Sequence, residues 1–511
     1  MNLLRKFAIL SHRYLGIVFS LLVVMWFASG ILMIYTGGMP RIDPQDRLEH
    51  LPPLQISQIR ITPAKAADAV GFDPAIGFEG RVTLLTVNGR PAYRFGGAAT
   101  VYADSGQQMD DLSVDQSKSV AASYLRLPQE KLRFAGTLTG VDQWTLGLNR
   151  LLPLHKFAAD DGLGSELYVQ PETGEVAMLT TRQSRIMAWL STIPHWLYFT
   201  RLRDNQPVWY QIVVWTSTVV CVVAALGLIL VFAQLRRTRP FRLSTAIPYR
   251  GWLRWHYLTG AVFGLFTLTW AFSGLLSMEP VAWTRAEGLE IPRQAFTGGP
   301  TILAQFPQMD AADWEKLLGG RAAKEIELVR IQGDHYYLVR TAADTTAAAQ
   351  PRERLHQPYN VNGRSETGRL IVSASTLESR SEPFSVDSLV ERMRKAVPET
   401  PVVEQTVLRE YDSYYYSRGR QTPLPVLRVK FGDPAQTWYY VDPELSRTVT
   451  AVHRMSRLER WLYSGLHDLD FSFWYGRRPL WDIGMITLLL GGLASSTIGL
   501  CLGVKRMWRA L

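Results

Sequence analysis

Four of the nine histidines fall into pairs that an internal repeat relates to each other. A shift of 244 residues places the segment that begins at His12 on the segment that begins at His256. A shift of 272 residues places His195 on His467. Imidazole is a common metal ligand, and two imidazoles can bind one iron from opposite faces. We therefore expect two metal-binding pairs, His12 with His256 and His195 with His467.

A stripe of glycine and aromatic residues accompanies the first histidine of each repeat. The stripe reads His12, Gly16, Phe19, Trp26 and Gly30 in one repeat, and His256, Gly260, Phe263, Trp270 and Gly274 in the other. At 3.6 residues per turn, all members fall within about 40° of one line. A glycine lacks the side chain that would hold a flat ligand away from the backbone. We expect Gly16 and Gly260 to make room beside one pair. We expect Gly30 and Gly274, about 27 Å further along the helices, to make room beside the other.

Four segments have the length and composition of membrane spans. Apart from His256 they lack ionisable side chains other than Tyr and Cys, and each is long enough for a bilayer core of about 30 Å. The four are Leu15–Tyr35, Val208–Ala233, Trp255–Met278 and Ile483–Val504. The first recurs as the third, which favours a retained helix over a signal peptide. Each of the other two spans follows a predicted helix, Ser184–Tyr198 with His195 and Glu459–Phe473 with His467.

The basic residues indicate how the chain crosses the membrane. Segments 1–13, 234–254 and 505–511 together hold twelve Lys and Arg and no Asp or Glu. Short basic segments stay in the cytoplasm, so we expect both termini and the middle loop inside and the two large loops outside. His12 and His256 then lie at the inner boundary, and His195 and His467 at the outer one. Because the basic residues flank the spans, the sequence does not favour a nucleic-acid partner.

Several cofactor classes are disfavoured by the remaining motifs. Cys221 and Cys501 both lie in apolar spans, so we expect no disulfide framework, covalent c-type haem or iron–sulfur cluster. No glycine-rich fingerprint follows a strand and no P-loop occurs, which excludes an NAD, flavin or ATP domain. Two histidine pairs in parallel repeats favour two non-covalent haem b groups between the helices. Zinc is the alternative, but it usually takes more than two protein ligands, and no carboxylate or cysteine is placed to help.

The large loops alternate helical and strand patterns. Thr62–Val70 begins with a Thr-Pro helix start, and Arg81–Val87 and Ala92–Phe95 flank an Asn-Gly turn that is typical of a β-hairpin. The run ELYVQPETGEVAMLT predicts strand, turn and strand. The second loop repeats this character more loosely and contains a predicted irregular stretch, Thr341–Arg364.

Nearly the whole sequence resembles the PepSY-associated transmembrane proteins of bacteria. The resemblance rests on HRYLG and its span, the Trp189–His195 and Trp461–His467 helices, RWHYLTG, and the endings YVQPETGEV and YVDPELSRTV. It implies an inner-membrane haem b protein, and some members reduce ferric siderophores in the periplasm. Carried over by position, His12, His195, His256 and His467 match the family's histidines. The departures, PELSR in place of PETGE and a long 341–364 loop, concern the substrate.

The combined expectation is a membrane α-helical fold with four spans in two parallel repeats and two periplasmic α+β PepSY-like regions. The expected parts are a span in 1–37, a periplasmic region in 38–182, an interfacial helix and span in 183–235, a basic loop in 236–254, a span in 255–279, a second periplasmic region in 280–455, and an interfacial helix and span in 456–511. The expected function is electron transfer from an unidentified donor through two haems to a ferric siderophore or another periplasmic acceptor, with no catalytic residue assigned. The alternative is a non-redox protein that binds or inhibits a periplasmic partner such as a peptidase.

Overall fold

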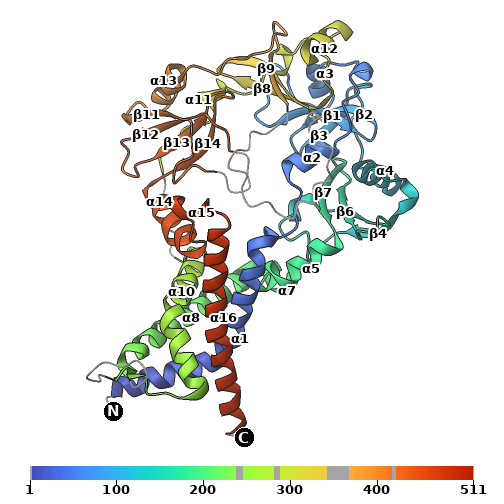
Figure 1. The fold of residues 1–511 in the computed structure, drawn as a ribbon. Coiled ribbons are helices and arrows are strands. Elements are labelled where there is room, and N and C mark those ends of the chain that lie inside the picture. Colours follow the sequence, from blue (N-terminus) through green and yellow to red (C-terminus); the bar gives the residue numbers. More distant parts are fainter. Residues whose placement is uncertain (1–2, 237–245, 281–287, 342–367, 417–421, 510–511) are drawn as a thin grey trace.

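Four long helices form the membrane part of the protein. The computed structural model describes residues 3–236, 246–280, 288–341, 368–416 and 422–509. The long helices are α1 (Leu3–Thr36), α8 (Gln206–Gln234), α10 (Gly251–Leu276) and α16 (Leu480–Trp508). Each overlaps a predicted span, and all four are long and apolar enough to cross a bilayer, which confirms this part of the predicted fold. The start of α1 and the end of α16 lie at the same end of the bundle, away from the strands (Figure 1).

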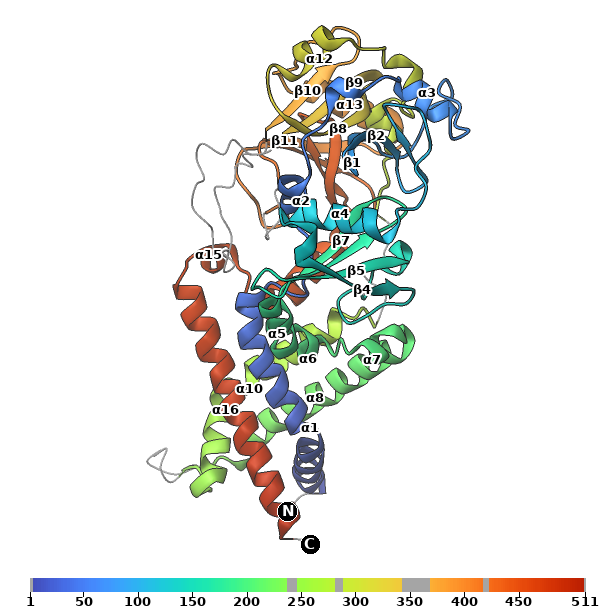
Figure 2. The ribbon, with the colours of Figure 1, turned by 90° about the vertical axis from the view of Figure 1, so that its right-hand side faces the viewer.

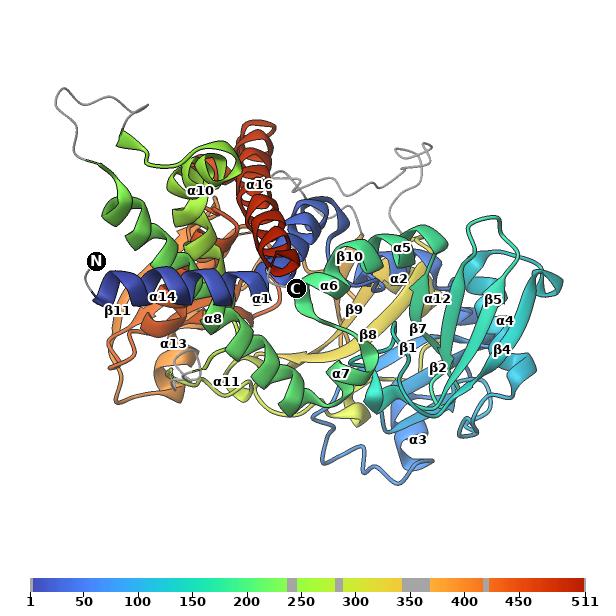
Figure 3. The same ribbon diagram turned by 90° about the horizontal axis from the view of Figure 1, so that it is seen from below.

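The four helices pack as a ring in which α1 and α10 occupy opposite corners. Helix α1 packs against α8 and α16, and α10 packs against the same two helices (Figure 3). Two adjacent glycines of α16 allow aromatic rings to enter the bundle. A Cβ atom on Gly491 would collide with the ring of Phe263, and one on Gly492 would collide with the ring of Phe27. The bundle interior is therefore closely packed with aromatic side chains at mid-height.

Outside the bundle the described chain forms four units, each a helix followed by antiparallel strands. The first half holds α3 (Pro63–Asp68), β1 (Val82–Val87), β2 (Arg90–Phe95) and β3 (Ala99–Tyr102), then α4 (Val114–Leu125), β4 (Leu132–Leu138), β5 (Leu154–Ala159), β6 (Glu166–Gln170) and β7 (Glu175–Thr180). The second half holds α12 (Ala311–Leu318), β8 (Ala323–Ile331), β9 (Asp334–Thr341) and β10 (Arg369–Ser373), then α13 (Val386–Ala396), β11 (Val402–Leu408), β12 (Val426–Phe431), β13 (Trp438–Asp442) and β14 (Arg447–Val452). The predicted helix at Thr62–Val70, the Asn-Gly hairpin and the strand pair of β6 and β7 are confirmed. Most of the stretch Thr341–Arg364 lies outside the described residues.

The two halves share one sheet. Six strands lie in the order β10-β9-β8-β1-β2-β3, and β1 pairs antiparallel with β8, so that Val82 lies opposite Leu328. Two further sheets, β4 to β7 and β11 to β14, stand between this sheet and the long helices (Figures 1 and 2). The two extramembrane regions, which the sequence presents as separate stretches, are therefore joined by backbone hydrogen bonds.

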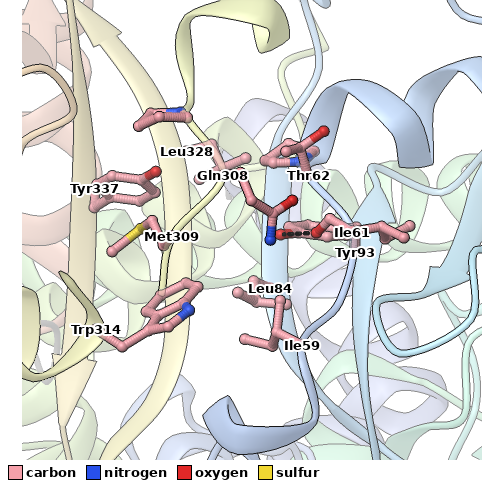
Figure 4. A pocket seen from close by; sticks show the side chains of 12 residues that line it. Ile59, Ile61, Thr62, Leu84, Tyr93, Gln308, Met309, Trp314, Leu328 and Tyr337 are labelled. Carbon is pink, nitrogen blue, oxygen red and sulfur yellow. Dashed lines mark hydrogen bonds between the residues drawn. The ribbon is translucent and has the colours of Figure 1, made fainter. Parts of the chain in front are cut away.

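Helices α3 and α12 cover one face of the six-stranded sheet. The core between them includes Tyr93, Trp314 and Tyr337. It contains a cavity of about 10 Å³, lined by these side chains and by Met309 (Figure 4). A cavity of this size holds about one water molecule, so it is a packing defect of the core and not a ligand site.

A buried carboxylate joins the halves on the opposite face. Glu325 of β8 is fully buried and forms ion pairs with Arg47, Arg81 and Arg340. Burial opposes the ionisation of Glu325, but the three guanidinium groups outweigh it and lower its pKa below the ordinary value. Arg47 also pairs with Glu175 of β7 at 2.7 Å, and it lies in the short helix α2 (Pro44–His50). These ion pairs connect β7, β8 and the segment that follows α1.

The helices before the second and fourth spans differ from the prediction. The expected helix Ser184–Tyr198 is broken at Ser191 into α5 (Arg182–Leu190) and α6 (Thr192–Trp196), and α7 (Thr200–Asp204) follows. Pro194 explains the break, because its ring has no N–H and would clash with the carbonyl four residues earlier. In the second half α14 (Arg454–Arg460) passes into a π-helical turn at Trp461–Gly465, followed by α15 (Ser472–Tyr475). The expected single helix Glu459–Phe473 is therefore wrong as well. A short helix, α11 (Gln294–Thr297), precedes α12.

Candidate functional site

His12 and His256 face each other across the bundle. His12 lies on α1 and His256 on α10, and their ring centroids are 6.2 Å apart with the ring planes inclined at 34°. Each ring is hydrogen bonded to a third helix. Nδ1 of His12 lies 2.9 Å from the carbonyl oxygen of Val223 in α8. Nδ1 of His256 lies 3.1 Å from that of Ser495 in α16. The Nδ1–H group donates in this geometry, so Nε2 is the nitrogen that would bind a metal.

A glycine lies one turn beyond each of these carbonyl groups. In an α-helix the carbonyl of residue i points toward residue i+4, where a side chain would shield it from an outside donor. Gly227 follows Val223 by four residues, and Gly499 follows Ser495 by four. A Cβ atom on Gly227 would lie 2.9 Å from Cε1 of His12, and one on Gly499 would lie 3.1 Å from Cε1 of His256. These two glycines therefore form the seats of the first histidine pair.

The sequence analysis did not assign Gly227 and Gly499 to the site. The signal was present, because a shift of 272 residues places Gly227 on Gly499 as it places His195 on His467. Their role depends on packing between helices that are more than 200 residues apart in the chain. The pattern within one helix could not reveal it.

His195 and His467 form the second pair at the other end of the bundle. Their ring centroids also lie 6.2 Å apart, but the planes are inclined at 75°. Nδ1 of His195 lies 3.1 Å from the carbonyl oxygen of Trp26 and 3.1 Å from Oγ of Ser29 in α1. Nδ1 of His467 lies 3.0 Å from Oγ of Ser273 in α10. Both rings are thus fixed by the helices that carry the first pair.

The predicted glycines fall into two classes. A Cβ atom on Gly30 would lie 3.3 Å from Cε1 of His195, and one on Gly274 would lie 3.8 Å from Cε1 of His467. These two glycines lie beside the second pair, where the sequence places them. A Cβ atom on Gly16 would have no described atom within 4 Å, and one on Gly260 would meet only Oγ of Ser495, at 3.8 Å. Gly16 and Gly260 therefore contact neither histidine and border open space.

His195 is neutral at physiological pH. Burial lowers the pKa of His195 to about 4, and the proximity of His467 adds to this effect. A neutral imidazole is the form that donates an electron pair to a metal.

Both pairs have the geometry of two imidazoles on one metal ion. A metal–nitrogen bond of about 2.0–2.1 Å places two trans imidazole centroids roughly 6.4 Å apart. The measured separation is 6.2 Å in each pair. Among the described residues there is no group of three or more His, Cys, Asp or Glu side chains that could hold a metal ion. Two ligands on opposite sides fit an iron whose other four ligands come from a macrocycle better than they fit zinc.

Trp26 has an unsatisfied polar atom beside the second pair. Its counterpart Trp270 donates from Nε1 to the carbonyl oxygen of His467 at 2.8 Å. Nε1 of Trp26 is buried and has no hydrogen-bond partner among the described residues. A buried N–H without a partner is costly, so this donor fits a bound group that carries an acceptor.

The space between the pairs is apolar. Seventeen residues of α1 separate His12 from Ser29, which corresponds to about 25 Å along the helix. Phe27, Phe266 and Trp270 lie in this interval, with Trp270 in ring contact with both phenyl groups. The two pairs therefore face opposite ends of one dry bundle.

The other described histidines have local roles. His50 and His155 bond through Nδ1 to the carbonyl of Asp46 and the hydroxyl of Ser117. The ring of His453 accepts from Ser456 at the start of α14. His335 was predicted to lie on the surface, but it is half-buried, and its Nε2 accepts a hydrogen bond from the backbone N–H of Ile302. His356 lies outside the described residues.

Comparison with known proteins places the chain in a family. No curated protein is found to match it. A family model described as the PepSY-associated TM region matches residues 10–506, so the chain belongs to the family of proteins with this region.

Proposed function

We propose that this chain is a di-haem membrane protein that passes electrons across the bilayer to an extramembrane acceptor. The observation that carries the proposal is the occurrence of two imidazole pairs with the same 6.2 Å separation at opposite ends of one bundle. His12 and His256 would hold one haem b, and His195 and His467 would hold the other. When bound, haem iron supplies one-electron exchange between its ferric and ferrous states.

The protein groups around the histidines support this role. The Nδ1 hydrogen bonds to Val223, Ser495, Ser29 and Ser273 fix each ring and strengthen it as a ligand. The glycines beside the rings leave room for a flat macrocycle. The aromatic packing between the pairs excludes water and ionisable side chains from the path.

The orientation is also part of the proposal. The basic segments favour a bacterial inner membrane with both termini in the cytoplasm and the strands in the periplasm. Electrons would then enter from an unidentified donor at the His12 and His256 end. A reporter fused after Leu511 is expected to be active only in the cytoplasm, and one inserted at residues 362–364 only in the periplasm. The reverse pattern would invert the direction of transfer.

The proposed acceptor is a ferric siderophore. This part rests on the resemblance to members that reduce such chelates, and no residue is assigned a catalytic role. The test is to reduce the purified protein in vesicles and add a ferric hydroxamate together with a ferrous-iron trap. We expect haem oxidation and ferrous iron to appear together. Haem that remains reduced would exclude this acceptor and leave the haem assignment intact. Absence of any haem spectrum would instead favour a non-redox protein that binds a periplasmic partner.

A further inference from the structure

The segment after His195 is held by a loop of the neighbouring extramembrane unit. The side chain of Gln143, in the loop after β4, donates from Nε2 to the carbonyl oxygen of Tyr198 at 2.7 Å. Its Oε1 accepts a hydrogen bond from the hydroxyl of Thr200, also at 2.7 Å. Tyr198 follows His195 by three residues, so this contact lies one short step from the ring.

The same carbonyl position is held in the second half by different chemistry. Asp470 follows His467 by three residues, and its backbone carbonyl accepts from Nη2 of Arg460 at 2.8 Å. Nε of Arg460 donates to the carbonyl oxygen of Ser413 at 2.8 Å. Ser413 directly follows Asp412, as Gln143 directly follows Asp142. A glutamine bridges loop and segment in one half, and an arginine bridges them in the other.

Both loops are fixed to the cores of their units by an aspartate. Oδ1 of Asp142 accepts from the backbone N–H groups of the second and third residues after it, and Oδ1 of Asp412 does the same. Oδ2 of Asp142 accepts from the hydroxyl of Tyr168 at 2.7 Å, and Oδ2 of Asp412 accepts from Tyr440 at 2.9 Å. Both tyrosines are fully buried in the adjoining sheets. The loops therefore transmit the position of each unit.

The held segments also contain matching strained residues. Leu197 has φ 53° and Leu469 has φ 49°, and a shift of 272 residues relates the two. A leucine in the left-handed region is unfavourable and persists where its surroundings fix it. The hydrogen bonds to Tyr198 and Asp470 act on the very next residue.

We propose that Gln143 and Arg460 are positioning residues that set the orientation of His195 and His467 and so couple the extramembrane units to the outer haem. Each outer ring is fixed on one side by α1 or α10, through Ser29 or Ser273, and on the other by its loop. The rings of His12 and His256 are hydrogen bonded to α8 and α16. The outer pair alone should therefore respond to a change in the loops. This inference rests on the proposed haem function.

The test replaces each bridging side chain in the full-length protein. Gln143→Glu removes the donor to Tyr198 and keeps an acceptor for Thr200, and Arg460→Met removes the charged bridge. Gln129→Glu, at an exposed site of the same unit, is the matched control. The readouts are the low-spin ferric electron paramagnetic resonance signal, which depends on the angle between the two imidazole planes, and the midpoint potential of each haem.

We expect the outer haem signal and potential to shift in both variants, with the inner haem and the control unchanged. Unchanged outer signals in Gln143→Glu, or equal changes of both haems, would overturn the positioning role. If Arg460→Met does not accumulate, Gln143→Glu decides alone. The wild-type spectrum is recorded first. Absence of haem there would overturn the proposed function and this inference with it, whereas two haems with unresponsive variants would overturn the inference alone.

Discussion

The rings of His12 and His256 lie 6.2 Å apart although their helices stand at opposite corners of the bundle. Each ring reaches its position by leaning on a neighbouring helix at a backbone carbonyl, with a glycine one turn further on. His195 leans on the carbonyl of Trp26 in the same way, with Gly30 one turn on. His467 is held by Ser273 on the corresponding face of α10. One packing motif, repeated with small variation, therefore places all four imidazoles.

The first prediction concerns Gly227. In Gly227→Ala the new methyl group would lie 2.9 Å from the His12 ring, closer than such atoms approach in proteins. Overpacking of this kind typically costs about 1–3 kcal/mol, and turning the ring would relieve it at the expense of the metal bond. We expect loss or weakening of the inner haem, with the outer haem retained, in reduced-minus-oxidised spectra.

Gly260→Ala is the matched control for this variant. Its methyl group would meet only Oγ of Ser495, at an ordinary 3.8 Å, and helix α10 would gain a better helix former. Both haems should remain. Equal loss of the inner haem in the two variants would show that the contact between Gly227 and His12 has no special role.

The second prediction concerns the hydroxyl groups beside the outer pair. Ser273→Ala removes the acceptor at 3.0 Å from Nδ1 of His467. Loss of such a partner typically lowers metal affinity or activity about 10–100-fold. We expect faster loss of the outer haem to a haem-scavenging protein, and little change in the inner one. Ser277→Ala, which removes an exposed hydroxyl in the residue after α10, should behave like wild type. Retention of the outer haem at the wild-type rate in Ser273→Ala would contradict this role.

The third prediction concerns stability. Glu325→Ala removes a fully buried carboxylate and leaves the charges of Arg47, Arg81 and Arg340 without it. Removing one partner of a buried ion pair costs about 3–5 kcal/mol. We expect a lower midpoint of thermal unfolding for the extramembrane part, with Glu382→Ala, at an exposed site, as control. A midpoint equal to that of the control would contradict the role of this cluster in joining the halves.

The spans and the histidine pairing could be predicted because both depend on local pattern and on the repeat. Segments such as Val208–Ala233 announce themselves by length and apolar character, and His195 falls on His467 at the same shift that aligns the strands around Tyr168 and Tyr440. The matching extends to the sheets, where the register shifts between Tyr168 and Val169 and between Tyr440 and Val441.

Features that depend on distant packing could not be predicted. The pairing of β1 with β8 joins residues more than 240 positions apart, such as Val82 and Leu328, and neither strand names its partner. The break at Ser191 was missed although Pro194, a local signal, was present. The role of Gly227 required knowing which ring would lie against it. The direction of the field of view from one helix favoured Gly16, which lies on the right face but contacts no histidine.

The central claim is that the four histidines form two haem sites, and alanine substitution tests it most directly. The measurement is the haem content and the reduced-minus-oxidised spectrum of His12→Ala, His256→Ala, His195→Ala and His467→Ala at matched expression. The account predicts two b-type haems in the wild type. His12→Ala and His256→Ala should lose the same haem, and His195→Ala and His467→Ala should lose the other. A wild-type protein without a haem spectrum, or loss of one and the same haem in His12→Ala and His195→Ala, would contradict it.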